Sequence, residues 1–115
     1  MQPELDLGRL AELEELLGRG VPEIVKTLAS ELTKAMAGIE AGVAAADLTA
    51  AALAVHEARN SALMLNAEPM LNALREIEAA ARVPDPARAR AGLDDLRPVW
   101  EALRTRLNAE AQRAG

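Results

Sequence analysis

The chain has 115 residues, a formal net charge of −5 and no cysteine, so disulfides and thiol chemistry are excluded. The length suits one domain, over residues 1–115, with a continuous core. The negative charge opposes binding to nucleic acid or anionic membranes, and no apolar run reaches the ~20 residues of a membrane span. Alanine (26 residues) and leucine (18) dominate, and β-branched and aromatic residues are scarce. This composition predicts an all-α fold, and we expect a soluble, cytoplasmic protein.

The first predicted helix begins after Asp6, a residue type that caps helix N-termini, and ends at Gly18. It is too short to be stable alone, so we expect it to cap a larger bundle. Its inward-facing residues are Leu7, Leu10, Leu13 and Leu17. The second predicted helix begins at Pro22, which suits a first turn. Its apolar residues recur at spacings of three and four: Ile24, Leu28, Leu32, Ala35, Ile39 and Val43.

The third predicted helix spans residues 48–65 and has Asp47 as its N-cap. Its core-facing residues are Leu48, Ala51, Val55, Ala58, Ala62 and Leu65. Asn66 and Pro69 mark a break and a restart, and the fourth helix then runs to Arg82. Its inward-facing residues are Met70 or Leu71, Leu74, Ile77 and Ala81.

The last predicted helix begins near Pro86, because Val83 and Pro84 end the fourth. We expect Pro98 to kink it. Its buried residues are Leu93, Leu96, Trp100, Leu103 and Leu107. Short connections make consecutive helices antiparallel neighbours. The sequence therefore predicts an antiparallel up-down four-helix bundle with a short N-terminal capping helix.

His56 is the only histidine, and it lies in the middle of the third predicted helix. It is one residue, about 100°, away from the core-facing stripe, so its ring should reach water at the edge of the bundle. Arg59 and Asn60 follow it by three and four residues, on the same helix face. A neutral imidazole is a nucleophile near pH 7, and a guanidinium one turn away can stabilise phosphoryl oxygens. This pattern predicts phosphoryl transfer at His56.

Glu78 is the predicted partner of the imidazole. If the third and fourth helices pair about a turn centred on Ala67, His56 and Glu78 lie level, since each is eleven residues from it. Attack by one ring nitrogen needs the proton on the other, and a carboxylate can accept that hydrogen bond. We therefore expect Glu78 to orient His56.

These residues resemble the histidine-containing phosphotransfer (HPt) domain. The family has a basic residue, a glycine and a small residue three, four and five positions after its histidine, which correspond to Arg59, Asn60 and Ser61. An L-G-A-like break before the next helix corresponds to residues 65–67. The resemblance covers most of the chain and implies transfer through Nε2 of the histidine. It also implies a Gln or Glu 22 positions later that orients Nδ1, and Glu78 occupies that position.

The sequence departs from the family at three positions. Asn60 and Asn66 replace two glycines, and Ala58 replaces a Leu or Ile. Asn66 tolerates the left-handed conformation that a helix end often needs. Asn60 adds a side chain where the family glycine lets a partner approach the histidine.

The resemblance implies a phosphoryl carrier that works with partner proteins. The chain has no nucleotide-binding motif, so we expect no enzyme activity of its own. Donor and acceptor would be a histidine kinase and response-regulator receiver domains, with Mg²⁺ in the receiver and no cofactor or metal in this chain. We expect a monomer, with a bacterial source favoured by its Ala- and Arg-rich composition. The surface that contacts the partner would comprise Ala52, Leu53, Asn60, Ser61 and Leu63.

Two other interpretations stay open. A degenerate HPt-like bundle would bind receiver or kinase domains without accepting phosphate, and Asn60 favours it. A plain helical scaffold or dimerisation module would have no role in signalling.

Overall fold

The computed structural model describes residues 6–113, which form five α-helices and no strand. The helices are α1 (Leu7–Leu17), α2 (Val21–Ala44), α3 (Leu48–Met64), α4 (Glu68–Arg82) and α5 (Pro86–Arg113). Their order and bounds follow the predicted helices closely. Within residues 6–113, no helix combines the length and the apolar composition that a bilayer span needs.

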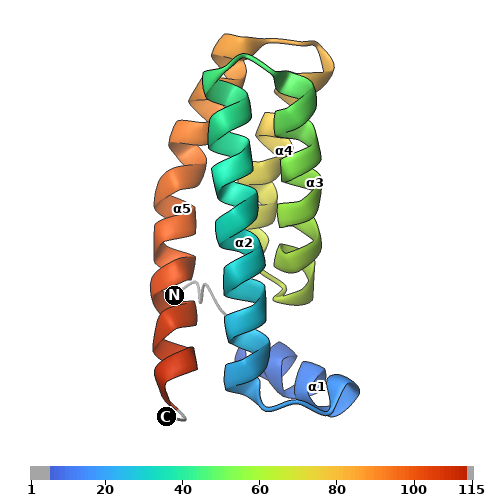
Figure 1. Cartoon of the computed structure of the whole chain (residues 1–115), viewed down its shortest axis with the longest axis vertical. Coiled ribbons are helices and arrows are strands. Elements are labelled where there is room, and N and C mark those ends of the chain that lie inside the picture. Colours follow the sequence, from blue (N-terminus) through green and yellow to red (C-terminus); the bar gives the residue numbers. More distant parts are fainter. Residues whose placement is uncertain (1–5, 114–115) are drawn as a thin grey trace.

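The four longer helices form an antiparallel bundle (Figure 1). The helix α2 packs against α3 and α5, and α4 completes the bundle by packing against the same two helices. The short helix α1 lies across one end of the bundle, beside the turn between α3 and α4 (Figure 1). The predicted bundle with an N-terminal capping helix is therefore confirmed.

The core forms from one face of each helix. The predicted core-facing residues of α2, α3 and α5 are all buried, and so are those of α4 except Ala81, which is half-buried. The prediction for Leu17 is wrong, because its side chain is 50% exposed. Since α1 crosses the end of the bundle, only Leu10 and Leu13 of the predicted set are seen to reach the core. The side chain of Leu7 lies outside the described residues.

Local signals set the helix ends. Asp47 caps α3, where its carboxylate accepts a hydrogen bond of 3.1 Å from the backbone N–H of Ala50. Asn66 has a φ of 57°, the left-handed conformation expected for it. Ala46 has a similar φ of 54° after α2, although a run of alanines gives no sign of a turn. The helix α5 continues through Pro98, and the kink there stays a prediction.

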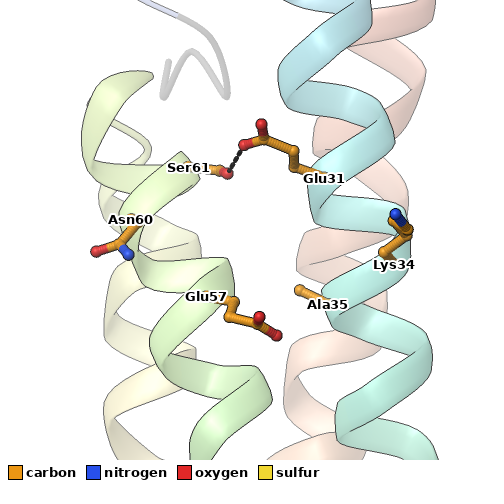
Figure 2. A pocket seen from close by; sticks show the side chains of 6 residues that line it. All are labelled: Glu31, Lys34, Ala35, Glu57, Asn60 and Ser61. Atoms are coloured by element: carbon orange, nitrogen blue, oxygen red, sulfur yellow. Dashed lines mark hydrogen bonds between the residues drawn. The ribbon is translucent and has the colours of Figure 1, made fainter.

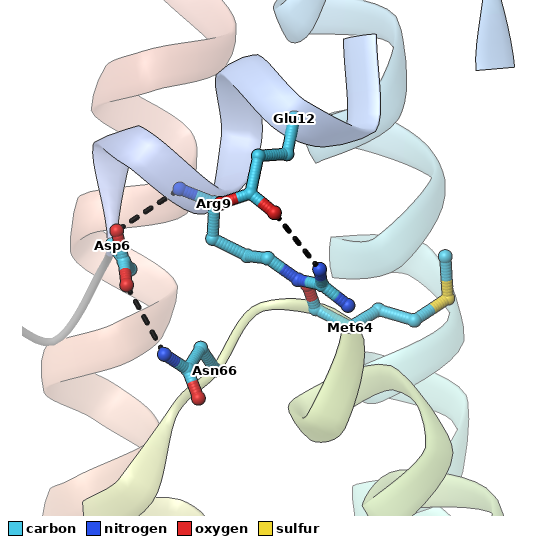
Figure 3. A network of polar contacts seen from close by, with 5 residues as sticks. All are labelled: Asp6, Arg9, Glu12, Met64 and Asn66. Atoms are coloured by element: carbon cyan, nitrogen blue, oxygen red, sulfur yellow. Dashed lines mark hydrogen bonds and ion pairs between the residues drawn. The ribbon is translucent and has the colours of Figure 1, made fainter. Parts of the chain in front are cut away.

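Polar contacts attach α1 to the turn between α3 and α4 (Figure 3). The Nε of Arg9 donates to the carbonyl oxygen of Met64 at 2.9 Å, one of the last carbonyls of α3. The carboxylate of Asp6 accepts from the backbone N–H of Arg9 at 3.0 Å and from Nδ2 of Asn66 at 3.1 Å. Asp6 therefore caps its own helix and also holds the turn that follows α3.

Asp6 should make the attachment of α1 sensitive to acid. The backbone N–H of Arg9 and the amide of Asn66 lower the pKa of Asp6 below its ordinary value of 3.8. A lowered folded pKa means that the stabilisation is present above pH 3.8 and is lost as the pH falls through the folded pKa. Removing both acceptor oxygens should loosen α1 in the same way, so hydrogen exchange of the α1 amides should accelerate several-fold in Asp6→Ala at pH 6, with α5 unchanged. Equal α1 exchange in the two proteins would contradict this role.

The helices α2 and α3 approach closely at Gly42. A Cβ on Gly42 would lie 2.7 Å from the backbone nitrogen and 2.9 Å from the Cα of Ala51. Real Cβ atoms do not approach backbone atoms so closely, so the two helices would have to separate. Gly38, one turn earlier, is less constrained, because its Cβ would meet only the Cβ of Ala54 at 3.0 Å.

Gly42→Ala is therefore expected to destabilise the protein, although alanine forms helices better than glycine. The gain in helix propensity is about 1 kcal/mol, whereas overpacking costs about 1–3 kcal/mol. Urea unfolding measures the net loss, and Gly38→Ala is the matched comparison with the smaller expected effect. A Gly42→Ala protein more stable than the wild type would show that this close approach is not needed.

Candidate functional site

His56 lies on the exposed face of α3, beside the buried Val55. His56 follows a core-facing residue of α3 by one position, about 100° around the helix, so its ring is exposed to solvent as predicted. Within residues 6–113, His56 makes no hydrogen bond and no ion pair. The ring is therefore available to a partner from outside the bundle.

Arg59 and Glu78 connect α3 and α4 beside this histidine. Nη1 of Arg59 lies 4.0 Å from Oε2 of Glu78, and the Glu78 side chain is 27% exposed. The antiparallel pairing of α3 with α4 thus brings the carboxylate to the helix face that carries His56 and Arg59. A cation one turn from the imidazole and a carboxylate across the helix pair are both present.

The predicted hydrogen bond from His56 to Glu78 is absent among the described contacts. The carboxylate pairs with Arg59 and with Arg82, whose Nη2 lies 3.9 Å from Oε1 of Glu78. Both arginines are charged, and the carboxylate lies between their guanidinium groups. The orienting role of Glu78 is therefore not visible in this state.

Arg82 is a site residue that the sequence analysis missed. Its spacing from Glu78 could have identified it: Arg82 follows Glu78 by four residues, so the two side chains lie one helical turn apart on the same face. Together with Glu78 it lines a depression between α3 and α4, which also includes Thr49 and Ala52. Ala52 lies four residues before His56, so this depression adjoins the histidine.

Ser61 was predicted to contact a partner, and this prediction is wrong. Its side chain is 2% exposed, and its hydroxyl donates to Oε2 of Glu31 on α2 at 3.1 Å (Figure 2). A small residue five positions after the histidine therefore serves the packing of α2 against α3. Glu57 and Asn60 are both exposed, and they line the pocket between α2 and α3 together with Ser61 (Figure 2).

No protein-family model matches the sequence, and no curated protein matches it significantly. The structure is similar to the crystal structure of histidine-containing phosphotransfer protein B (HptB) from Pseudomonas aeruginosa PAO1, with a TM-score of 0.86. The two chains are 23% identical, and the match covers 98% of each. The chain has the fold of an HPt protein. The HPt fold here includes the capping helix α1, because the match extends over nearly the whole chain.

On this HPt fold, two large apolar side chains flank His56 along α3. Leu53 is 66% exposed and Leu63, near the end of the helix, is 49% exposed. Ala52 is half-buried and Asn60 is exposed. Four of the five residues predicted to contact a partner are thus accessible, and only Ser61 is not.

Proposed function

We propose that this protein is a phosphorelay carrier that accepts a phosphoryl group on His56. The donor would be the aspartyl phosphate of a receiver domain or the phosphohistidine of a histidine kinase, and the acceptor a receiver aspartate. One observation carries the proposal: a single exposed imidazole on α3 of an HPt fold, with the guanidinium of Arg59 one turn away. We infer a cytoplasmic monomer with no resident cofactor.

The transfer from a receiver is an in-line displacement at phosphorus. Nε2 of neutral His56 attacks, an N–P bond forms, and the P–O bond to the aspartate breaks and leaves a carboxylate. The ring becomes cationic and keeps its proton on Nδ1, where Glu78 would accept a hydrogen bond. Arg59 would donate hydrogen bonds to the phosphoryl oxygens as the group is transferred to His56. The receiver supplies Mg²⁺, so most of the catalytic machinery belongs to the partner.

The docking surface for the partner would be the exposed face of α3. Leu53 and Leu63 lie on either side of the histidine along this helix, and Ala52 and Asn60 complete the surface. Burying these exposed leucines against a partner would remove apolar surface from water and so favour the complex. A receiver that covers this face would also exclude water from the reacting phosphoryl group.

The decisive test is transfer of labelled phosphate. The chain is incubated with a receiver domain that carries a radioactive aspartyl phosphate and Mg²⁺. We expect up to one label for each chain, labile in acid and stable in alkali, as a phosphohistidine is. A chain that takes up no label, or an alkali-labile label, would contradict the proposal.

The exposed side chain of Asn60 favours one alternative, a module that binds receivers without accepting phosphate. In that case the receiver binds and no label is transferred, whereas a plain scaffold neither binds nor takes up label. If the chain is a carrier, Asn60→Gly is expected to transfer faster, because it removes a side chain one turn after His56. Single-turnover rates compare the two proteins, and an unchanged rate would show that Asn60 does not obstruct the approach.

A further inference from the structure

The carboxylate of Glu78 bridges two guanidinium groups on two helices. Arg59 reaches it from α3 at 4.0 Å, and Arg82 reaches it from the last turn of α4 at 3.9 Å. Neither pair is within hydrogen-bond distance, in contrast to Arg104 and Glu101 on α5, which meet at 2.7 Å. The contacts of Glu78 are therefore loose, and either arginine can leave without breaking a hydrogen bond.

A phosphoryl group on His56 changes the charge balance at this bridge. The phosphoryl group itself carries a charge of about −2, and even with the positive charge on the ring, this face gains a net negative charge beside the carboxylate of Glu78. Arg59 is the nearest cation along α3, so it is needed at the phosphoryl oxygens. If Arg59 leaves Glu78 with no other partner, two anionic groups remain side by side, and their repulsion opposes the transfer.

We propose that Arg82 is a positioning residue that keeps Glu78 neutralised while Arg59 moves to the phosphoryl group. This inference rests on the proposed function. Arg82 itself does not touch the phosphoryl oxygens. It acts through Glu78, which would then accept the hydrogen bond from Nδ1. The resting state, in which Arg59 and Arg82 share one carboxylate, holds the second cation ready one helical turn away.

The experiment measures single-turnover transfer from a phosphorylated receiver domain to the full chain, over a range of receiver concentrations. Arg82→Gln is expected to lower the rate at saturating receiver by about three- to fivefold, the size of one exposed charge interaction. The receiver concentration at half-saturation should stay the same, because Arg82 acts after docking. Arg82→Lys should restore the rate to within about twofold of the wild type, since the charge is kept.

Two further variants separate positioning from a general effect of charge. Arg75→Gln is the matched control, because Arg75 is an exposed arginine of α4 that bonds Asn72 and does not contact Glu78. Its rate should equal that of the wild type. In a Glu78→Gln background there is no carboxylate to neutralise, so adding Arg82→Gln should change the rate by less than about twofold.

Several results would overturn this inference. An equal rate in Arg82→Gln and Arg75→Gln would show no role for Arg82 at the bridge. A loss that persists in the Glu78→Gln background would mean that Arg82 acts on the phosphoryl group directly. If Arg82→Gln changes only the receiver concentration at half-saturation and not the saturating rate, Arg82 is a docking residue. Each of these leaves the carrier function standing, whereas a wild-type chain that accepts no label overturns both.

Discussion

The His56→Gln variant is expected to take up no phosphoryl group from a labelled receiver while keeping its fold. His56 is the only imidazole, and the chain has no thiol that could replace it. The amide of glutamine has no nucleophilic nitrogen lone pair, yet it can still donate and accept hydrogen bonds. Because His56 is exposed and bonds to no described residue, its loss should change the free energy of unfolding by less than about 0.5 kcal/mol.

The neighbouring residue provides the control for this experiment. Glu57→Gln changes an exposed side chain on the same turn of α3 and leaves the imidazole in place, so it should still accept label. Thermal unfolding followed by circular dichroism checks that both variants are folded. Receiver binding by His56→Gln should persist, since Leu53 and Leu63 are unchanged. Label on His56→Gln would place the acceptor at another residue and contradict the assignment.

The helices and the bundle could be predicted because their signals are local. The apolar spacing of α2 fixes which of its residues face the core, and Asp47 marks where α3 begins. His56 is exposed because of its offset from the core-facing stripe of its own helix. Each of these features depends on a few neighbouring residues, so the sequence alone contains the information.

The features that were missed depend on contacts between helices. Ser61 looks like a surface residue beside His56, but the packing of α2 brings Glu31 over its hydroxyl. The hairpin count assigned Glu78 to His56, but it could not show that the carboxylate pairs with Arg59 and Arg82. The close approach of Gly42 to Ala51 likewise follows from the angle between two helices. Side-chain partners across an interface are set by three-dimensional geometry, which local spacing does not determine.

Leu74→Ala is expected to reduce the free energy of unfolding by about 2–5 kcal/mol. Leu74 lies on α4, one turn before Glu78, and its side chain is almost fully buried in the core. Removing it loses buried apolar contact and leaves a cavity that the neighbouring helices fill only in part. Small domains are stable by about 5–15 kcal/mol, so this loss is a large share of the total. Urea unfolding at constant pH measures it.

Leu53→Ala removes the same atoms from the surface, so it separates stability from docking. Because Leu53 is 66% exposed, its truncation should change the free energy of unfolding by less than about 0.5 kcal/mol. If this leucine contacts the receiver, the variant should need several-fold more receiver for half-saturation, at an unchanged saturating rate. Folded Leu74→Ala should show the opposite pattern, with normal docking and low stability. If Leu53→Ala needs the same receiver concentration for half-saturation as the wild type, Leu53 does not contact the receiver, because truncating a side chain that no partner covers leaves binding unchanged.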